Sequence, residues 1–238
     1  MWILRCKGGV TAKRLARELH CGYSRNPWMI PDDEQLIINY GSGYRGDEML
    51  NGNIITDKLE VSHILQENGI RTPRVYDRDE EIPDDVFPLL ARKRHHSQGK
   101  DIVYVHNQEQ LEQMGYQYDY LIRYINKKSE YRVHILGDYD ALVTVKIPDK
   151  DERYSDPIVR SKNNGWIQVS YDRDFYDDLV DLGHQVIKVL GYDFGAVDII
   201  RRKDRLYVLE VNSAPGLEPK KIAKYAEYFR WEKERREK

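Results

Sequence analysis

Near the end of the chain, apolar and polar residues alternate with a period of two, which predicts two strands joined by a charged turn. Residues 196–200 form the first run and residues 206–212 the second. Alternate side chains of an extended chain share a face, so Glu210 and Asn212 should lie side by side, on the same face as Val208.

The length of the turn between these strands decides which side chain lies opposite Asp198. A turn of three residues (203–205) or of five (202–206) places Asp198 directly across from Glu210. A turn of two or four residues would move Asp198 to the other face. Two carboxylates and an amide oxygen are hard ligands of the kind that Mg²⁺ prefers, so Asp198, Glu210 and Asn212 are a predicted magnesium site.

The rest of the chain mixes short strands and helices, which is an α+β pattern without an internal repeat. Strands are predicted at 2–5 and 36–40, before a glycine-rich stretch at 41–46 that we interpret as a flexible loop. Helix signals stand at four places: a cap near Thr11, a helix from Thr56 or Asp57 to Gly69, an apolar stripe over 175–190 that stops at Gly191, and a last helix over 220–238 opened by Pro219.

Composition narrows the class of protein. The chain has 238 residues, 33% of them charged, a net charge of -2, and no apolar run near the ~18 residues that a membrane span needs. We expect a cytoplasmic protein without a membrane partner, and the charge balance argues against a dedicated nucleic-acid binder. Cys6 and Cys21 form neither a disulfide framework nor a zinc site, so we expect reduced thiols.

The spacing Asp198-x(11)-Glu210-x-Asn212, followed by Ser-Ala-Pro-Gly-Leu-Glu at 213–218, resembles the metal-binding end of the ATP-grasp superfamily. It is most similar to the carboxylate–amine ligases of that superfamily, such as the α-L-glutamate ligases. The resemblance implies that these three side chains hold Mg²⁺, with Mn²⁺ as an alternative ion, between the phosphates of ATP. Without the resemblance, the motif reads as a surface hairpin in which Asn212 starts a turn.

The resemblance covers about residues 56–218 and implies an α+β ATP-grasp fold, in which two α+β subdomains clasp ATP. We assign residues 1–54 to an abbreviated α/β domain that precedes the ATP-grasp unit. Residues 55–122 are then its N-terminal subdomain. Residues 123–238 are its C-terminal subdomain, with the metal site and the last helix.

Four residues in the first half match family positions that contact the phosphates. Lys58 stands in the first turn of a helix, where the helix dipole disfavours a cation that has no anionic partner. Arg92 follows Pro88 by four residues, where the family usually has a lysine; Lys93 is adjacent, and the choice between the two stays open. Ser97 is the small polar residue of the flap that covers the phosphates. The alternative is a solvated basic loop.

The run 118–125 resembles the linker between the two subdomains, where backbone groups bind the adenine edge and apolar side chains enclose the ring. The resemblance assigns Arg123, Tyr124 and Ile125 to nucleotide binding. As single residues they also read as the core of a strand.

A strand with charged residues follows this linker. Glu130, Arg132 and His134 alternate onto one face. In the family the acid holds the ribose, and the arginine meets the reacting carboxylate or the γ-phosphate. Charged residues in mid-strand are costly to bury unpaired, so both should bind ligand or form a salt bridge. Lys146, at the end of the return strand, is assigned to the nucleotide site and is also a candidate clamp for a substrate carboxylate.

The stretch 158–165 resembles the Arg-Ser-Asn segment of the family. There the arginine, Arg160, stabilises the charge of phosphoryl transfer, and an asparagine orients the acceptor. One extra residue leaves open whether Asn163 or Asn164 is that asparagine. Asn164 followed by Gly165 also reads as a tight turn.

The implied activity is an ATP- and Mg²⁺-dependent ligation, in which ATP converts a carboxylate to an acyl phosphate and an amine displaces the phosphate to form an amide or peptide bond. The implied partners are a small-molecule or peptide carboxylate and an amine. Two alternatives remain: an ATP-grasp kinase that phosphorylates a hydroxyl, and a nucleotide-binding module without catalysis. The sequence names neither substrate and leaves the oligomeric state open.

Overall fold

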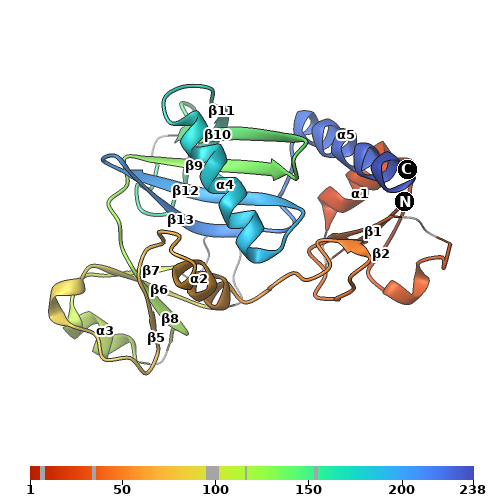
Figure 1. Ribbon diagram of the computed structural model, residues 1–238. Helices are drawn as coiled ribbons and strands as arrows, with labels where there is room; N and C mark the ends of the chain where they lie inside the picture. Colours follow the sequence, from red (N-terminus) through yellow and green to blue (C-terminus); the bar gives the residue numbers. More distant parts are fainter. Residues whose placement is uncertain (6–8, 34–35, 95–101, 116, 153–154) are drawn as a thin grey trace.

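The computed structural model describes residues 1–5, 9–33, 36–94, 102–115, 117–152 and 155–238 (Figure 1). The helices are α1 (Val10–Glu18), α2 (Lys58–Glu67), α3 (Gln108–Met114), α4 (Tyr176–Leu190) and α5 (Pro219–Arg236). The strands are β1 (Trp2–Arg5), β2 (Gly22–Ser24), β3 (Ile37–Tyr40), β4 (Met49–Leu50), β5 (Val75–Asp77), β6 (Leu89–Arg92), β7 (Val103–Val105), β8 (Tyr120–Arg123), β9 (Ser129–Leu136), β10 (Asp140–Pro148), β11 (Trp166–Ser170), β12 (Phe194–Arg202) and β13 (Arg205–Asn212).

The described strands form three sheets, which confirms the α+β class. A parallel sheet of order β2-β1-β3-β4 comes first in the sequence. An antiparallel sheet of order β5-β8-β6-β7 follows, and the largest sheet is antiparallel, of order β11-β10-β9-β12-β13. In Figure 1 the largest sheet lies in the middle, with the first sheet to its right and the second below it on the left.

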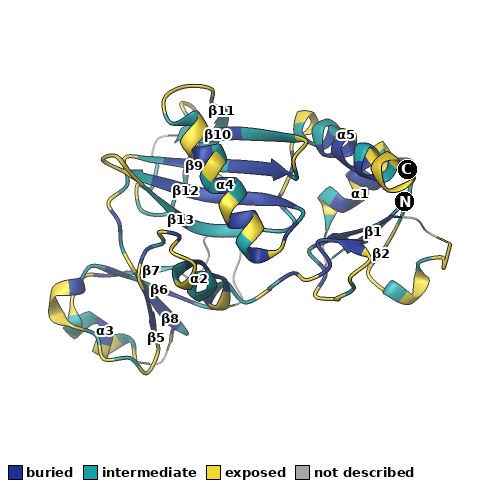
Figure 2. Ribbon diagram, in the orientation of Figure 1, coloured by how far each residue is buried: buried dark blue, intermediate teal, exposed yellow. Residues whose placement is uncertain are grey.

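Helix α4 covers one face of the largest sheet. The other face, called the polar face below, carries charged side chains such as Asp198 and Arg132 and packs against α5 at the end near Phe194. The buried stripe of α4, seen in dark blue in Figure 2, includes Leu179, Val186 and Leu190, which join the core of that sheet. Gly183 permits the close approach, because a Cβ there would lie 2.9 Å from Ile135 Cδ1. The stripe and the stop at Gly191 were predicted, and both are confirmed.

Helix α2 lies between the two antiparallel sheets. Its N-cap is Asp57, as predicted, whose carboxylate accepts a hydrogen bond from Leu59 N at 2.9 Å. Val61 and Leu65 pack into the core beside α4, whereas Leu59 packs with residues of the second sheet. The first turn of α2 is therefore fixed where the two sheets meet.

The first sheet and the last helix share one core. Helix α5, predicted over 220–238, packs Tyr225 and Phe229 against Phe194 of β12. Asn51, which has a left-handed φ of 54°, donates from its amide to Phe194 O at 2.9 Å and accepts from Asp193 N at 2.7 Å. The N-terminal piece is thus fastened to the largest sheet.

Two local expectations at the N-terminus differ from the structure. Helix α1 begins at Val10 after Gly9 with no side-chain cap, so the cap near Thr11 was wrong. The stretch 41–46 is braced by hydrogen bonds, because Asn39 donates to Ser42 O at 3.1 Å and accepts from Ser42 N at 2.8 Å. Within the described part of the chain, no helix has the length and apolar character needed to cross a membrane.

Candidate active site

Asp198 lies directly opposite Glu210, as predicted, but the predicted turn length was wrong. The turn holds two residues, 203–204, which alone would have placed Asp198 on the other face. A register shift next to Asp198 compensates, because Leu209 is left as an extra, unpaired residue on β13. This β-bulge restores the pairing of the two carboxylates.

The bulge also separates residues that were predicted to share a face. Val208 is buried in the core beside α4, and so the prediction that it lies on the face of Glu210 was wrong. Val211 contacts the same core, so its neighbours Glu210 and Asn212 point to the polar face. The three predicted metal donors therefore belong to one face of the sheet.

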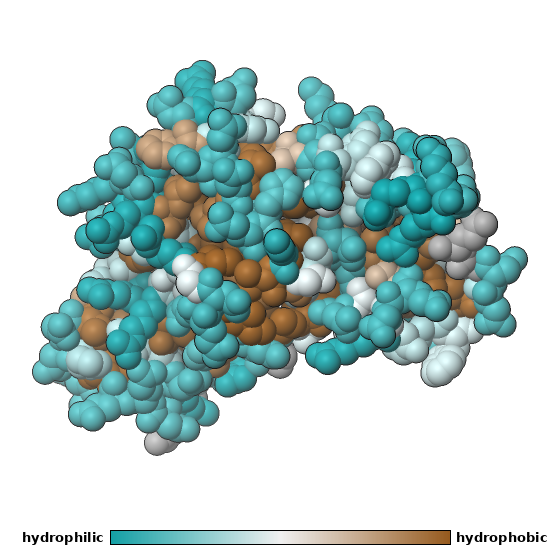
Figure 3. All heavy atoms as spheres, in the orientation of Figure 1, coloured by the Kyte–Doolittle hydropathy of each residue, from teal (hydrophilic) through white to brown (hydrophobic). Residues whose placement is uncertain are grey.

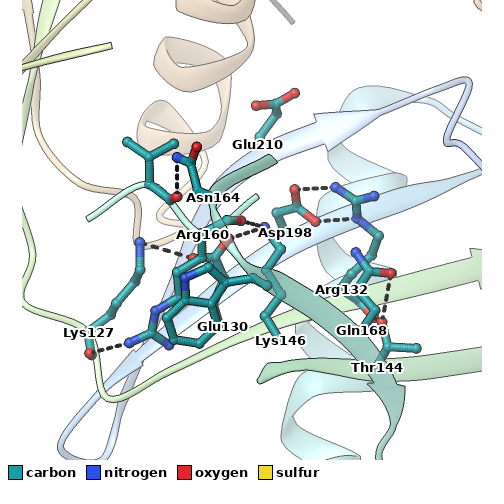
Figure 4. Close-up of polar contacts among 12 residues, drawn as sticks. Lys127, Glu130, Arg132, Thr144, Lys146, Arg160, Asn164, Gln168, Asp198 and Glu210 are labelled. Carbon is teal, nitrogen blue, oxygen red and sulfur yellow. Dashed lines mark hydrogen bonds and ion pairs between the residues drawn. The ribbon is translucent and has the colours of Figure 1, made fainter. Parts of the chain in front are cut away.

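Asp198 is paired with Arg132 of the neighbouring strand β9 (Figure 4). Arg132 Nε and Nη2 donate to the two carboxylate oxygens at 2.6 and 2.7 Å. Burial opposes the charge of Asp198, but the Arg132 guanidinium outweighs burial and holds the pKa of the carboxyl below its ordinary value. The sequence analysis expected Arg132 to bind ligand or to form a salt bridge, and in the structure it forms a salt bridge with Asp198 of the neighbouring strand β12.

Two cationic side chains from outside the largest sheet, one on helix α2 and one on strand β6, lie close to Glu210. Lys58 Nζ, in the first turn of α2, lies 2.8 Å from Glu210 Oε1, and Arg92 Nη2, at the end of β6, lies 3.6 Å from Glu210 Oε2. Lys93 Nζ instead lies 3.7 Å from Asp119. The structure therefore brings Arg92, and not its neighbour, to the carboxylates.

A second charged cluster surrounds Glu130, one strand further along the polar face. Lys127 Nζ lies 3.0 Å from Glu130 Oε2, and Lys146 forms an ion pair with the other oxygen and donates to Arg160 O at 2.7 Å. Burial lowers the pKa of Lys127 below its ordinary value, although Glu130 opposes the shift. Lys127 was not among the site residues predicted from the sequence. The one feature of the sequence that could have indicated it is its position three residues before Glu130.

A cavity of about 370 Å³ opens beside Glu210. Its walls come from α2, from the segment before it, from β13 and from Arg92 and Tyr120 of the second sheet. Glu210 and Asn212 line it together with Lys58. Among the described residues, no group of three or more His, Cys, Asp or Glu side chains could hold a metal ion. The predicted metal site is a different kind of group, because it consists of two carboxylates and the amide of Asn212.

This donor set fits a hard divalent cation. Asp198 and Glu210 are opposed on adjacent strands, and each carboxylate oxygen has a second lone pair besides the one that its cationic partner uses. Three cations converge on these two acids, which is the charge complement that phosphate groups need.

The sequence matches the family described as the RimK-like ATP-grasp domain over residues 55–227, which is more than half of the chain. The chain belongs to this ATP-grasp family. The family assignment made from the Asp-Glu-Asn spacing and the ATP-grasp fold that it implied are both confirmed.

Individual relatives of this ATP-grasp chain are distant. A D-alanine–D-alanine ligase of Fusobacterium nucleatum is 27% identical over 187 residues, which are 74% of this chain and 62% of that ligase. The chain therefore spans less than two thirds of the length of this relative.

Two solved structures share the fold. The D-alanine–D-alanine ligase of Bacillus anthracis complexed with ATP has a TM-score of 0.68 at 17% identity, over 96% of this chain and 93% of that chain. The ATP-grasp ligase PsnB complexed with minimal precursor, Mg and ADP has a TM-score of 0.67 at 10% identity, over 98% and 96%.

Arg160 of this ATP-grasp chain points away from the paired acids. Its guanidinium stacks on Trp166 at 4.3 Å and donates to Lys127 O at 3.3 Å. Burial lowers its pKa below the ordinary value. Asn164 is used structurally, since its amide donates to Val159 O at 2.8 Å, whereas Asn163 is exposed. The assignment of either asparagine to an acceptor contact stays a prediction.

The predicted adenine linker forms β8 and the residues after it. The amides of Arg123 and Tyr124 donate to Arg74 O at 2.8 Å and to Pro88 O at 3.0 Å. Ile125 is buried, and the side chain of Arg123 is exposed. Their assignment to adenine stays a prediction, and Ser97 and Cys6 lie outside the described residues.

Proposed function

We propose that this chain is an ATP- and Mg²⁺-dependent carboxylate–amine ligase that forms an amide or peptide bond through an acyl phosphate. The observation that carries the proposal is the convergence on Glu210 of Lys58 from α2 and Arg92 from β6. A carboxylate on one sheet and cations from the elements facing it form a site with both metal-binding and phosphate-binding groups.

The ion pairs of Glu210 with Lys58 and Arg92 could be exchanged for contacts with Mg²⁺ and phosphate when Mg²⁺ and nucleotide bind. Asp198, Glu210 and Asn212 would hold Mg²⁺, which when bound neutralises and orients phosphate oxygens. Lys58 and Arg92, released from Glu210, would then bind phosphates. The exchange keeps every buried charge paired, so neither the acids nor the cations bear the cost of an uncompensated charge.

The remaining predicted residues would position the reacting groups. In the first step a substrate carboxylate oxygen attacks the γ-phosphorus and ADP leaves as the β–γ bridging bond breaks. In the second step the amine nitrogen attacks the acyl carbon and phosphate leaves. Arg132 would balance the charge that develops on the transferring group, and Asn163 would orient the acceptor. Arg160 would join Arg132 only after its guanidinium leaves Trp166 and Lys127 O.

The substrate pair and the division of the chain are also part of the proposal. We propose a small-molecule or peptide carboxylate and an amine as substrates; relatives named D-alanine–D-alanine ligases and a PsnB complex with a precursor support this range. We propose bounds of 1–54, 55–122 and 123–238 for the three parts, supported by the three separate sheets.

The test is a mass-spectrometric search for ATP-dependent condensation products with amino acids and peptides, run beside an assay of phosphate release. We expect phosphate release that requires both a carboxylate and an amine. Glu210→Gln should lower it by about 100-fold or more, since one carboxylate of the charge-neutralising site is lost. Glu109→Gln, on the exposed face of α3, should leave it unchanged.

Two outcomes would overturn the proposal. A stable phosphorylated product that forms without an amine would make the protein a kinase. Binding of Mg-nucleotide without turnover across the whole panel would make it a binding module.

A further inference from the structure

The cavity beside Glu210 continues past the charged groups into the space between α2 and the edge strand β13. Its volume of about 370 Å³ falls within the range of roughly 300–1,000 Å³ that small-ligand pockets have. Lys58, Arg92 and Glu210 stand at one end, and α2 residues as far as Leu65 line the other. The cavity is therefore larger than the phosphate contacts alone require.

Part of the cavity wall is aliphatic. Five branched side chains from the segment before α2, from α2 itself and from β13 line the cavity, namely Ile54, Val61, Leu65, Val208 and Val211. Leu65, about two helical turns from Lys58, marks the end farthest from the charged groups, which we call the inner end. All five belong to or pack against the core beside α4. Figure 3 shows hydrophobic atoms gathered at the centre of the view, near the place of α2 and α4 in Figure 1.

The two hydroxyl groups at this end already have partners. Ser62 Oγ donates to Lys58 O at 3.0 Å, within the helix. Thr72 Oγ1 accepts from Gln66 Nε2 at 2.7 Å and lies 3.2 Å from Pro73 O, to which it donates. A charged side chain placed here would lose its hydration without gaining a partner, whereas an aliphatic one would gain by leaving water.

We propose that this cavity is the side-chain subsite for the carboxylate substrate, and that it selects a branched aliphatic amino acid. The inference rests on the ligase function proposed above and names its substrate class. The substrate carboxylate lies at the end with Lys58 and Arg92, near the phosphates, and its side chain enters between α2 and β13. Acidic and basic amino acids are excluded by the inner wall.

The test compares two single substitutions to methionine on α2 in the full chain. Ser62→Met adds a long apolar side chain to the inner wall and fills the space that the substrate side chain needs. His63→Met introduces the same side chain one residue along, at a half-buried position that does not line the cavity. The probes are L-leucine, L-valine, glycine, L-glutamate and L-lysine, titrated calorimetrically with MgADP present.

We expect the unaltered protein to bind leucine or valine at least roughly ten-fold more tightly than glycine, glutamate or lysine, the gain that burial of a branched side chain gives. Ser62→Met should remove that preference, and His63→Met should keep it. Both variants should bind MgADP within two-fold of the unaltered protein, which shows that they are folded and retain the nucleotide site.

The inference is overturned if none of the five amino acids binds, if glutamate or lysine binds most tightly, or if Ser62→Met and His63→Met behave alike. The ligase proposal fails separately, by the absence of amine-dependent phosphate release. Leucine binding that persists without turnover would sink the ligase proposal and leave the subsite in place as a binding site.

Discussion

His134 lies on the polar face of the largest sheet, next but one to Arg132, and is fully buried. Its Nδ1 is 3.0 Å from the hydroxyl of Tyr225 in α5. Burial, reinforced by Arg132 and Lys221, lowers the pKa of His134 to about 3, from roughly 6.5 for an exposed histidine. The folded protein therefore holds this ring neutral.

This shift gives the stability of the fold a pH dependence. Because the pKa is lower in the folded state, the unfolded chain binds the proton first as the pH falls, so stability is complete above about pH 6.5 and declines toward pH 3. Between pH 7 and pH 5 this residue should cost about 2 kcal/mol.

His134→Gln should abolish that decline, since an amide can still bond to Tyr225 but does not titrate in this range. The measurement is urea unfolding at pH 7 and pH 5. The unaltered protein should lose about 2 kcal/mol more than the variant over this interval. Equal losses would mean that His134 is not held neutral by burial.

Single residues also show where counting along the sequence fails. The sequence did not decide whether Arg92 or Lys93 contacts the phosphates, or whether Asn163 or Asn164 orients the acceptor. A one-residue shift in a loop or at a strand end exchanges such neighbours. In the structure Arg92 lies beside Glu210, which favours Arg92 over Lys93 as the phosphate contact but leaves that role a proposal. Asn164 is hydrogen-bonded to Val159, and the acceptor role of either asparagine stays a prediction.

At the scale of elements, the β12–β13 hairpin shows what alternation can and cannot predict. The period of two identified both strands and the pairing of Asp198 with Glu210, but not the two-residue turn or the bulge at Leu209. A bulge has no fixed sequence signal, because it is stabilised by packing on both sides of the strand. The pairing was correct because the turn and the bulge offset each other.

A substitution in helix α4 tests how closely this helix packs against the largest sheet. Gly183→Leu would place a side chain where even a Cβ comes within 3.1 Å of Val133 Cγ1. We expect a loss of about 1–3 kcal/mol in the free energy of unfolding, from overpacking against β9. Gln185→Leu, on the exposed face of the same helix, should change it by less than about 0.5 kcal/mol.

Chemical denaturation measures both variants. A Gly183→Leu protein as stable as the Gln185→Leu protein would mean that α4 does not pack on the sheet at this distance.

At the scale of the whole molecule, the sequence predicted three parts of the chain but not the contacts that join them, and the bounds of the parts stay a prediction. The ranges 1–54, 55–122 and 123–238 each contain one sheet, apart from the last residue of β8. Helix α5 packs on the first sheet, and α2 packs on the largest. Such long-range burial depends on which apolar faces meet, and local patterns carry no information on that.

The joined parts also explain where the site lies. Lys58, Arg92 and Glu210 come from three elements that are far apart in the sequence and meet beside one cavity. The ATP-grasp family motif predicted the acids from their spacing, and the resemblance supplied the cations. The sequence indicated that Lys58 and Arg132 need anionic partners, but not that Glu210 and Asp198 are those partners.

The most direct test of the account is a calorimetric titration of ADP with and without Mg²⁺, in the unaltered protein and in Glu210→Gln. We predict that Mg²⁺ raises the affinity for ADP by at least about ten-fold in the unaltered protein. In the variant this gain should vanish, while Mg²⁺-free ADP binds at least as well, because Lys58 and Arg92 no longer pair with a carboxylate. An equal gain from Mg²⁺ in both proteins would contradict the assignment of the metal site.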